Sequence, residues 1–176
     1  NGLYEFQNGH FKAFYNHKNA PINFATNDES MEYELVTGVK FDSNDNLWVF
    51  NSQSKISSLL QYSNQKWTSH STPALMSFNG RSLANVQNLM FDSRGRLWFV
   101  NNNWTLPSLY SYQPQNKTLH TFTSFTNQDG TKLKELWNVR CAVEDKEGNI
   151  WIGTNVGPLM LEPSQMDSDN PVFQQI

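Results

Sequence analysis

The sequence predicts an all-β fold: a fragment of a β-propeller, with about three four-stranded blades and a two-stranded half blade. The main observation is a short phrase that occurs three times, as FDSNDNLW (41–48), FDSRGRLW (91–98) and VEDKEGNIW (143–151). In each copy an Asp stands six residues before a Trp; the pairs are Asp42 and Trp48, Asp92 and Trp98, and Asp145 and Trp151. Self-similarity at a period of about 50 residues is typical of a propeller array.

The composition is that of a polar, aromatic-rich β protein. Aromatic residues make up 14% of the chain and charged residues 16%, the latter against a usual share of about 25%. The net charge is −3 and no cluster of Lys and Arg is present, which excludes nucleic acid as a partner. No apolar run approaches the ~18 residues of a membrane span, so we expect no membrane contact by this segment.

Each repeat predicts four strands in order. A strand rich in β-branched and aromatic residues comes first, the Asp turn follows, and the strand that carries the Trp comes next. First strands are expected at 38–41, 86–91 and 139–143, second strands at 47–50, 97–100 and 150–153, third strands at about 58–62, 108–112 and 158–161, and fourth strands at about 67–70, 119–125 and 172–176. Residues 131–139 are the only stretch that suggests a helical turn.

The turn between the first two strands has its own chemistry. An Asp at its start can accept hydrogen bonds from backbone amides two residues on. Gly95 and Gly148 share a position that we expect to need a positive φ, and Asp45 is the stand-in there. The spacing of Asp42, Asn44 and Asn46 also resembles a calcium loop. Since Arg94 and Arg96 occupy the equivalent places in the second copy, we favour a structural turn.

The domain organisation follows from this pattern. Residues 1–16 read as strand, turn and strand, like the second half of later repeats, and predict a trailing half blade. Full blades are expected at 37–70, 86–125 and 139–176. Three and a half blades cannot close a ring of about 4–8, so the whole chain is interpreted as part of one larger propeller, a processed or excised piece of a longer protein. Its expected partners are the remaining blades, with self-association through open blade faces as an alternative.

Nothing in the sequence argues for catalysis, a metal or a cofactor. No nucleophile motif, phosphate-binding loop or metal-ligand spacing occurs. The histidines stand singly, and we expect His70 and His120, on outer strands, to face solvent. Cys141 lies in an apolar run, where we expect it to behave as a small buried hydrophobe.

Two sets of residues are candidates for a role. The repeated ones are expected to serve the scaffold, through packing between blades and turn closure: Asp42, Trp48, Asp92, Gly95, Trp98, Asp145, Gly148, Trp151, Gly153 and Thr154. A ligand is more plausible at the insertions 16–36, 71–85 and 126–138 and in the loop 101–107, since loops on a rigid scaffold carry binding. Aromatic faces beside amide side chains suit sugars or peptides. The ligand-binding candidates are Trp104, Asn102, Asn103 and Trp137, although a loop Trp that packs on its own blade is the simpler alternative.

The third repeat has a specific resemblance. VEDKEGNIWIGT (143–154) and the following residues to Gly157 resemble the two-component-regulator propeller repeat, with Asp145, Gly148, Trp151, Gly153 and Thr154 at its characteristic positions. The first two copies depart after the Trp, where Asn51 and Asn101 stand in place of Thr. As an array, the resemblance extends over residues 38–176.

The resemblance implies one of two settings. In that family the repeats build periplasmic propellers ahead of a membrane span and a histidine kinase, where they sense products of polysaccharide breakdown in gut bacteria. A sister group carries the repeat in secreted proteins associated with type IX secretion, and the Asn-containing strands and the 127–130 loop lean toward it. The family's repeat motif implies no ligand residues.

We therefore expect a non-enzymatic, periplasmic or cell-surface propeller segment that senses or binds a ligand, of carbohydrate type, for a two-component regulatory system. The alternative is a surface propeller of a type IX secretion-associated protein that mediates protein–protein interaction. A propeller hydrolase or lyase is a third, less favoured class, because it would need a cluster of His and carboxylates or a bound metal.

Overall fold

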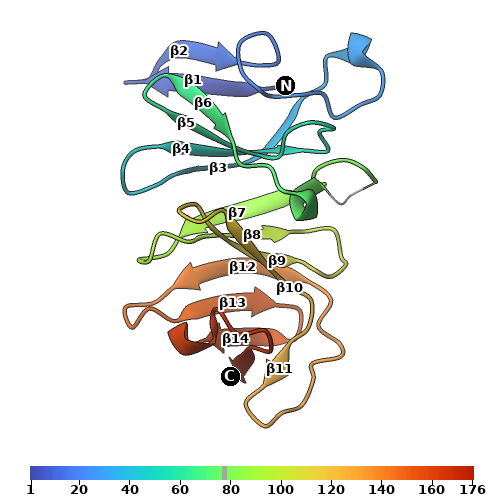
Figure 1. Ribbon diagram of the computed structural model, residues 1–176, viewed down its shortest axis with the longest axis vertical. Coiled ribbons are helices and arrows are strands. Elements are labelled where there is room, and N and C mark those ends of the chain that lie inside the picture. The colour runs from blue at the N-terminus through green and yellow to red at the C-terminus, as the bar shows by residue number, and fades with distance from the viewer. Residues whose placement is uncertain (77–78) are drawn as a thin grey trace. The chain divides into compact units, whose positions relative to one another are not determined.

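The computed structural model describes residues 1–76 and 79–176, so residues 77 and 78 of the 71–85 insertion lie outside the described part. The described strands form successive sheets that are antiparallel apart from one short edge strand (Figure 1). Three of these sheets are full blades and one is a half blade, which confirms the predicted fold class. The chain divides into two compact units, Asn1–Val86 and Gln87–Ile176.

Unit 1 contains the half blade and the first full blade. The half blade is a hairpin of two strands, and the blade is a four-stranded sheet with its strands in sequence order. The strands are β1 (Leu3–Gln7), β2 (His10–Tyr15), β3 (Leu35–Phe41), β4 (Leu47–Ser52), β5 (Leu59–Ser63) and β6 (Lys66–Ser69). Two 3-10 turns, η1 (Glu29–Met31) and η2 (Pro73–Met76), lie in the insertions.

A small core joins the half blade to the sheet β3–β6. Ile22, Val49 and Leu60 are fully buried, and Leu3 and Tyr15 of the hairpin pack against them. The ring of Tyr15 lies 5.4 Å from that of Tyr62 and 5.7 Å from that of Trp67, between centroids. The alternation of apolar residues along β1 and β5 thus turns one side of each strand towards this shared core.

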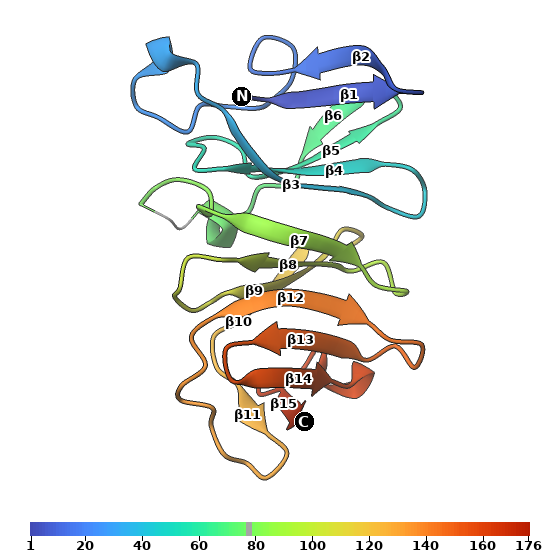
Figure 2. The same cartoon turned by 180° about the vertical axis from the view of Figure 1, so that it is seen from behind.

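Unit 2 contains the other two blades, with strand orders β10-β9-β8-β7 and β11-β15-β14-β13-β12; β7 and β8 of the first and β12 to β14 of the second can be followed in Figure 2. Their strands are β7 (Val86–Phe91), β8 (Leu97–Asn101), β9 (Leu109–Gln113), β10 (Thr118–Phe122), β12 (Val139–Glu144), β13 (Ile150–Thr154), β14 (Gly157–Leu161) and β15 (Val172–Gln175). A third 3-10 turn, η3 (Pro163–Gln165), follows β14.

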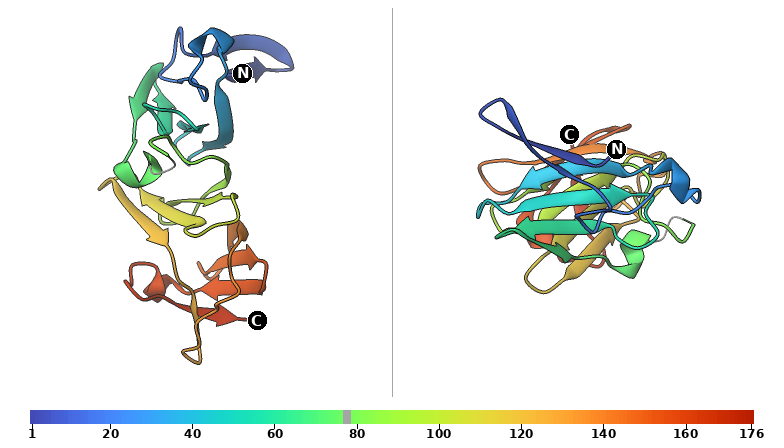
Figure 3. Two further views of the ribbon diagram at one scale, coloured as in Figure 1. Left: turned by 90° about the vertical axis from the view of Figure 1, so that its right-hand side faces the viewer. Right: turned by 90° about the horizontal axis from the view of Figure 1, so that it is seen from above.

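The last sheet has one strand more than the sequence predicts. The two-residue strand β11 (Thr126–Asn127) pairs in parallel with β15 at Val172 and Phe173. It belongs to the long segment between β10 and β12, which passes alongside the last sheet (Figure 3, left). Its two residues give too short a pattern to be recognised from sequence.

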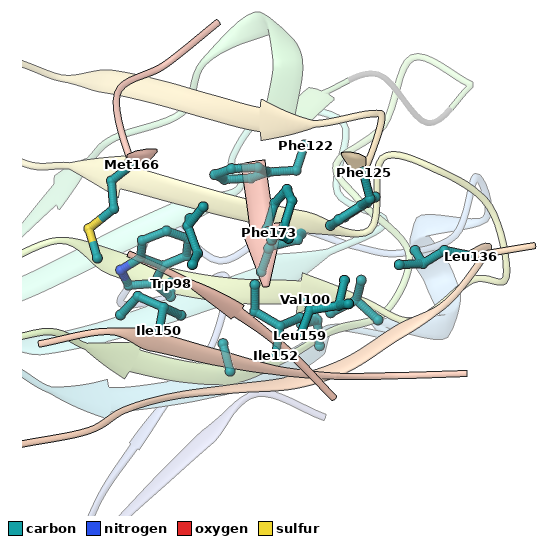
Figure 4. Packing of buried hydrophobic residues seen from close by; sticks show 14 residues of the cluster. Trp98, Val100, Phe122, Phe125, Leu136, Ile150, Ile152, Leu159, Met166 and Phe173 are labelled. Carbon is teal, nitrogen blue, oxygen red and sulfur yellow. The ribbon is translucent and has the colours of Figure 1, made fainter. Parts of the chain in front are cut away.

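The largest core lies between the two sheets of unit 2 (Figure 4). Trp98 and Val100 of β8 face Ile150 and Ile152 of β13, and all four are fully buried. Around them the cluster also contains Leu109, Phe122, Phe125, Leu136, Val139, Ala142, Leu159, Leu161, Met166 and Phe173. The repeated Trp of the second copy is therefore a core residue between neighbouring blades.

Three local expectations are wrong. Residues 131–139 form a bridge and a turn instead of a helical turn. Cys141 is exposed, because a β-bulge near Val139 shifts the register of β12 and turns Cys141 to the face opposite the core. His70 and His120 are only partly exposed: the ring of His70 is tilted against that of Trp48, 4.7 Å away between centroids, and the ring of His120 stacks on that of Phe122 at 4.4 Å.

The core of unit 2 predicts that substitutions at two residues of its C-terminal segment differ widely in their effect on the free energy of unfolding. Phe173 is fully buried and packs on Phe122 and Phe125. Phe173→Ala should lower the free energy of unfolding by about 3–5 kcal/mol through lost burial and a cavity. Ile176→Ala, at a residue 70% exposed, should change it by less than about 0.5 kcal/mol. Urea unfolding of both variants tests this, and equal effects would contradict the described core.

Candidate functional site

Each copy of the phrase is closed by one aspartate, which bonds both the turn and the Trp. In the first copy, Oδ1 of Asp42 accepts hydrogen bonds from the backbone N–H groups of Asn44 and Asn46, at 2.9 and 3.0 Å. Its Oδ2 accepts from Trp48 Nε1 at 2.9 Å. The same indole bond occurs at 2.9 Å from Trp98 to Asp92 and at 2.7 Å from Trp151 to Asp145. We call this arrangement the Asp–Trp clamp.

The shared turn position has the positive φ that the sequence predicts. The φ values are 60° at Asp45, 79° at Gly95 and 82° at Gly148. At Gly148 a Cβ would lie 2.7 Å from Nη2 of Arg94, but this atom ends a flexible side chain that can move aside. The positive φ therefore accounts for glycine at this position.

A fourth turn of the same kind stands in the loop 127–131, without a Trp. Asn127 takes the place of the Asp, and its Oδ1 accepts from the N–H groups of Asp129 and Thr131, at 3.3 and 3.0 Å. Gly130 has a φ of 85° at the matching position. The turn chemistry is therefore separable from the Trp, and in this loop it holds β11 in place beside β15.

The second copy uses its two arginines to link the blades of unit 2. Arg94 Nη1 lies 3.2 Å from Glu144 Oε1 and donates to the carbonyl of Gly148 at 3.1 Å. Arg96 makes two parallel hydrogen bonds of 2.8 Å to the carboxylate of Asp167. This pairing raises the pKa of Arg96 and, mainly through the hydrogen bonds from Arg96, lowers that of Asp167. Arg94 and Arg96, whose positive charges argue against a calcium loop, thus connect the two blades.

The clamp shifts the pKa of two of its carboxyl groups. Burial alone would raise the pKa of Asp42, but hydrogen bonds from Trp48 and Asn46 outweigh it and lower the pKa overall. At Asp145, the hydrogen bond from Asn149 is the largest influence and the one from Trp151 adds to it, so that pKa is lowered too. Both shifts arise because the hydrogen bonds favour the ionised carboxylate.

In the first and third copies, the residue three positions after the repeated Trp supports a loop. In the third copy, Thr154 Oγ1 donates to the carbonyl of Gly157 at 2.6 Å and accepts from the N–H of Val156 at 3.1 Å. In the first copy, the buried Asn51 accepts from the N–H of Asn23 at 2.8 Å and donates to the carbonyl of Leu35 at 3.2 Å. Asn51 thus anchors the insertion before β3. The shorter side chain of Thr would reach these backbone groups less well.

The two loop tryptophans proposed as ligand residues stack on each other. The rings of Trp104 and Trp137 lie 4.8 Å apart between centroids, with an interplanar angle of 27°. The two side chains are 55% and 41% exposed. The guanidinium carbon of Arg140 lies 5.4 Å from the centroid of the Trp104 ring, a cation–π contact. We call Trp104, Trp137 and Arg140 the aromatic cluster.

The topology explains why these residues meet. Trp104 follows the end of β8, and Trp137 precedes the start of β12. Because neighbouring strands in these sheets run antiparallel, the end of a second strand and the start of a first strand lie at the same end of the two sheets. Asn155 lies at that end as well, and its Oδ1 accepts from the N–H groups of Trp137 and Asn138, at 3.2 and 3.1 Å. Its Nδ2 donates to the carbonyl of Glu135 at 2.7 Å. The segment that carries Trp137 is therefore held by three hydrogen bonds with the side-chain amide of Asn155, which accepts two and donates one.

The amide candidates are less well placed than the tryptophans. Asn102 and Asn103 precede Trp104 in the same loop and are half-buried, and Oδ1 of Asn103 accepts from Thr105 Oγ1 at 2.9 Å. Sequence reasoning missed Asn138, Arg140 and Asn155. Asn138 is fully buried, and its Nδ2 and Oδ1 have no hydrogen-bond partner among the described residues. The recurrence of Asn-Val at 85–86 and 138–139 was the one sequence signal that could have drawn attention to it.

The described part of the chain offers no group of three or more His, Cys, Asp and Glu side chains that could hold a metal ion. Within the same residues, no helix combines the length and apolar character needed to cross a bilayer.

Comparison with known proteins finds a family match around the third copy of the phrase. Residues 133–156 match the family model described as Two component regulator propeller. This stretch is therefore similar to the repeat of that family. The match covers the Trp of the third copy, as well as Trp137 and Arg140 of the aromatic cluster, and confirms the resemblance seen in the sequence. No curated protein matches the chain.

Solved structures show the same fold. PorZ, an essential bacterial surface component of the type-IX secretion system of Porphyromonas gingivalis, is 19% identical, with a TM-score of 0.79 over 98% of this chain and 24% of its own. The extracellular domain of the hybrid two component system BT4673 from B. thetaiotaomicron is 18% identical, with a TM-score of 0.58 over 91% of this chain and 19% of its own. The chain thus spans about a quarter or less of the proteins it resembles.

The lowered pKa of Asp42 predicts a loss of stability in acid. A depressed carboxyl pKa stabilises the fold above the unfolded value of about 3.9, and this contribution is lost as the pH falls through the folded value. Asp42→Asn should be less stable than the wild type at pH 7 and should lose less stability between about pH 4 and pH 2. Urea unfolding across this range measures both effects, and an equally steep acid loss in the variant would count against the clamp.

Proposed function

We propose that this chain is a non-enzymatic, extracytoplasmic propeller segment that binds a carbohydrate ligand for a two-component regulatory system. The observation that carries the proposal is the exposed Trp104–Trp137 stack, held at the loop end of unit 2. The family of the repeat at 133–156 supports the regulatory setting. The extracellular origin of the BT4673 domain supports a location outside the cytoplasm.

The geometry of the stack points to Trp137 as the sugar platform. Stacking covers one face of each indole, and Arg140 also contacts the Trp104 ring. We propose that Trp137, which is 41% exposed, receives a pyranose ring on the indole face turned away from Trp104, because the C–H groups of the sugar favour an aromatic face. Asn155, which accepts a hydrogen bond from the backbone N–H of Trp137, would hold the platform rigid, and a rigid platform loses less entropy on binding.

A second candidate is supported by a different observation. PorZ superposes on nearly the whole chain, and Trp and Arg are the residues most enriched at energetic centres of protein interfaces. The aromatic cluster could accordingly serve a surface propeller that docks a protein of a type IX secretion machinery. The two functions differ in the ligand that the same cluster accepts.

In either setting we propose that the sheets act as blades of one larger propeller, at 37–70, 86–125 and 139–176, with residues 1–16 as the trailing half blade. The short share of PorZ and BT4673 that the chain covers supports further blades as partners.

Binding of oligosaccharides to the whole chain tests the proposal. A panel of neutral and acidic oligosaccharides should include at least one that binds, as measured by isothermal titration calorimetry. Trp137→Ala should weaken that binding by about tenfold or more, equivalent to about 1.4 kcal/mol, whereas Phe11→Ala, at an exposed aromatic of unit 1, should leave it unchanged. Absence of binding across the panel, or equal binding by Trp137→Ala, would contradict the sugar site. Capture of a protein that depends on Trp137 would favour the second candidate.

A further inference from the structure

Arg140 is the only arginine of the described chain whose guanidinium has neither a hydrogen bond nor an ion pair. The other three guanidinium groups donate to carbonyl or carboxylate oxygens; they belong to Arg81, Arg94 and Arg96. Arg140 is exposed and lies against the ring of Trp104, with its guanidinium carbon 5.4 Å from the ring centroid. A guanidinium that stacks on a ring uses its flat face, so its N–H groups, which lie in the plane, remain available to a ligand.

A β-bulge places Arg140 outside the regular ladder. In the pairing of β12 with β13, Val139 lies opposite Thr154 and Cys141 lies opposite Gly153, so Arg140 is the extra residue. A bulge bends its strand and changes the direction of the side chain that it carries, and bulges are common next to functional sites. The bulge thus accounts for an exposed arginine that directly follows a fully buried residue and reaches the loop after β8.

A side chain of the neighbouring sheet supports this bulge. The carbonyl of Arg140 accepts a hydrogen bond from Nδ2 of Asn88, in β7, at 2.5 Å. Asn88 has a φ of 54°, in the left-handed region that strand residues other than glycine seldom adopt. Backbone strain of this kind persists where the surroundings hold it, and it gathers at functional sites. An unusual residue of one blade therefore fixes the backbone of Arg140 in the next.

No carboxylate of the described residues lies within ion-pair distance of the Arg140 guanidinium. Glu144, on the same strand, is already paired with Arg94. In the segment before β12, the exposed Glu135 stands next to the exposed Lys134, so these two charges offset each other. A ligand that carries an anionic group would thus meet a positive charge that the protein has not neutralised.

The guanidinium lies close enough to the tryptophan stack for one ligand to reach both. The centroid of Trp137 is 4.8 Å from that of Trp104, and the guanidinium carbon of Arg140 is 5.4 Å from it. The guanidinium is therefore no further from the Trp137 ring than the sum of these two distances, a span that two linked sugar units cover. Its planar fork of N–H donors can bind two oxygens of a carboxylate, or of a sulfate group, through paired hydrogen bonds.

We propose that the aromatic cluster binds an acidic oligosaccharide, in which one unit stacks on Trp137 and a carboxylate or sulfate of the same or the next unit binds Arg140. This inference rests on the proposed carbohydrate function and adds to it the charge of the ligand. Asn88 is then a positioning residue, which acts through the backbone of Arg140. An acidic peptide would bring the same charge, but it lacks the face of C–H groups that suits the Trp137 ring.

Matched acidic and uncharged sugars test the charge preference on the whole chain. The probes for isothermal titration calorimetry are oligogalacturonides and their methyl esters, and sulfated galactan oligosaccharides and their desulfated forms. At least one acidic probe should bind about tenfold or more tightly than its uncharged counterpart, because hydrogen bonds between charged groups are the stronger ones. The pair that shows the difference distinguishes a carboxylate from a sulfate.

Three variants assign the preference to one side chain. Arg140→Gln should weaken binding of the acidic probe by about tenfold and leave binding of its uncharged counterpart unchanged. Arg140→Lys keeps the charge but loses the planar fork, so it should retain only part of the preference. Lys134→Gln removes another exposed positive charge from the same region and, as the matched control, should retain all of it.

Asn88→Gly tests the positioning role, because glycine adopts the left-handed backbone without strain but has no side chain to bond the carbonyl of Arg140. The variant should lose part of the preference for the acidic probe, while its affinity for the uncharged counterpart and its melting temperature stay close to those of the wild type. Full preference in Asn88→Gly would rule out this role.

The other outcomes separate this inference from the proposed function. Equal binding of acidic and uncharged probes, with no effect of Arg140→Gln, would overturn the charge preference and leave the sugar site in place. Absence of binding by every sugar would contradict the proposed function and this inference together. If a hexamer of glutamate bound through Arg140 as tightly as the acidic sugars, the ligand would be an acidic peptide instead.

Discussion

The Asp–Trp clamp is the interaction on which the rest of the structure depends. One carboxylate closes the turn through Oδ1 and holds the indole through Oδ2, in all three copies of the phrase. Because the indole of Trp98 is tied to the turn of its own hairpin, its ring is presented to the neighbouring sheet of unit 2 in one orientation. The core around Trp98 shows the consequence. A charge-assisted bond at each turn therefore sets both the shape of a blade and the way that blades stack.

Much of this scaffold could be predicted from sequence, because its causes are local. The alternation of apolar residues and the Asp turn give the strands, and the spacing of the phrase gives the repeat. The direct bond from Trp to Asp was missed, although the constant separation of six residues was the signal for it. β11 escaped prediction because two residues carry no period, and Cys141 was misplaced because a bulge changed the face of its strand. In each case a contact between distant residues overrode a local pattern.

The candidate ligand site, too, could be predicted from sequence only where its causes are local. Trp104 and Trp137 could be selected individually as loop aromatics, but their stacking depends on antiparallel strands that bring residues 33 positions apart to one end of the sheets. Arg140 and Asn155 gave no signal of their own, because an exposed Arg in a strand and an Asn after a Thr are ordinary in sequence. The loops of unit 2 thus form the proposed binding surface only after the clamps have set the blades.

The most direct test of the clamp is hydrogen exchange of the six indole N–H groups, measured by NMR on the whole chain. The indoles of Trp48, Trp98 and Trp151 donate to carboxylates, so they should exchange markedly more slowly than those of Trp104 and Trp137, which lie on exposed loops. Acidification through the pKa of Asp42 should also shift the NMR signal of the Trp48 indole N–H, because protonation changes the carboxylate that accepts its hydrogen bond. If the three repeated indoles exchanged as fast as the loop indoles at neutral pH, the carboxylate bond would not be what holds the blades.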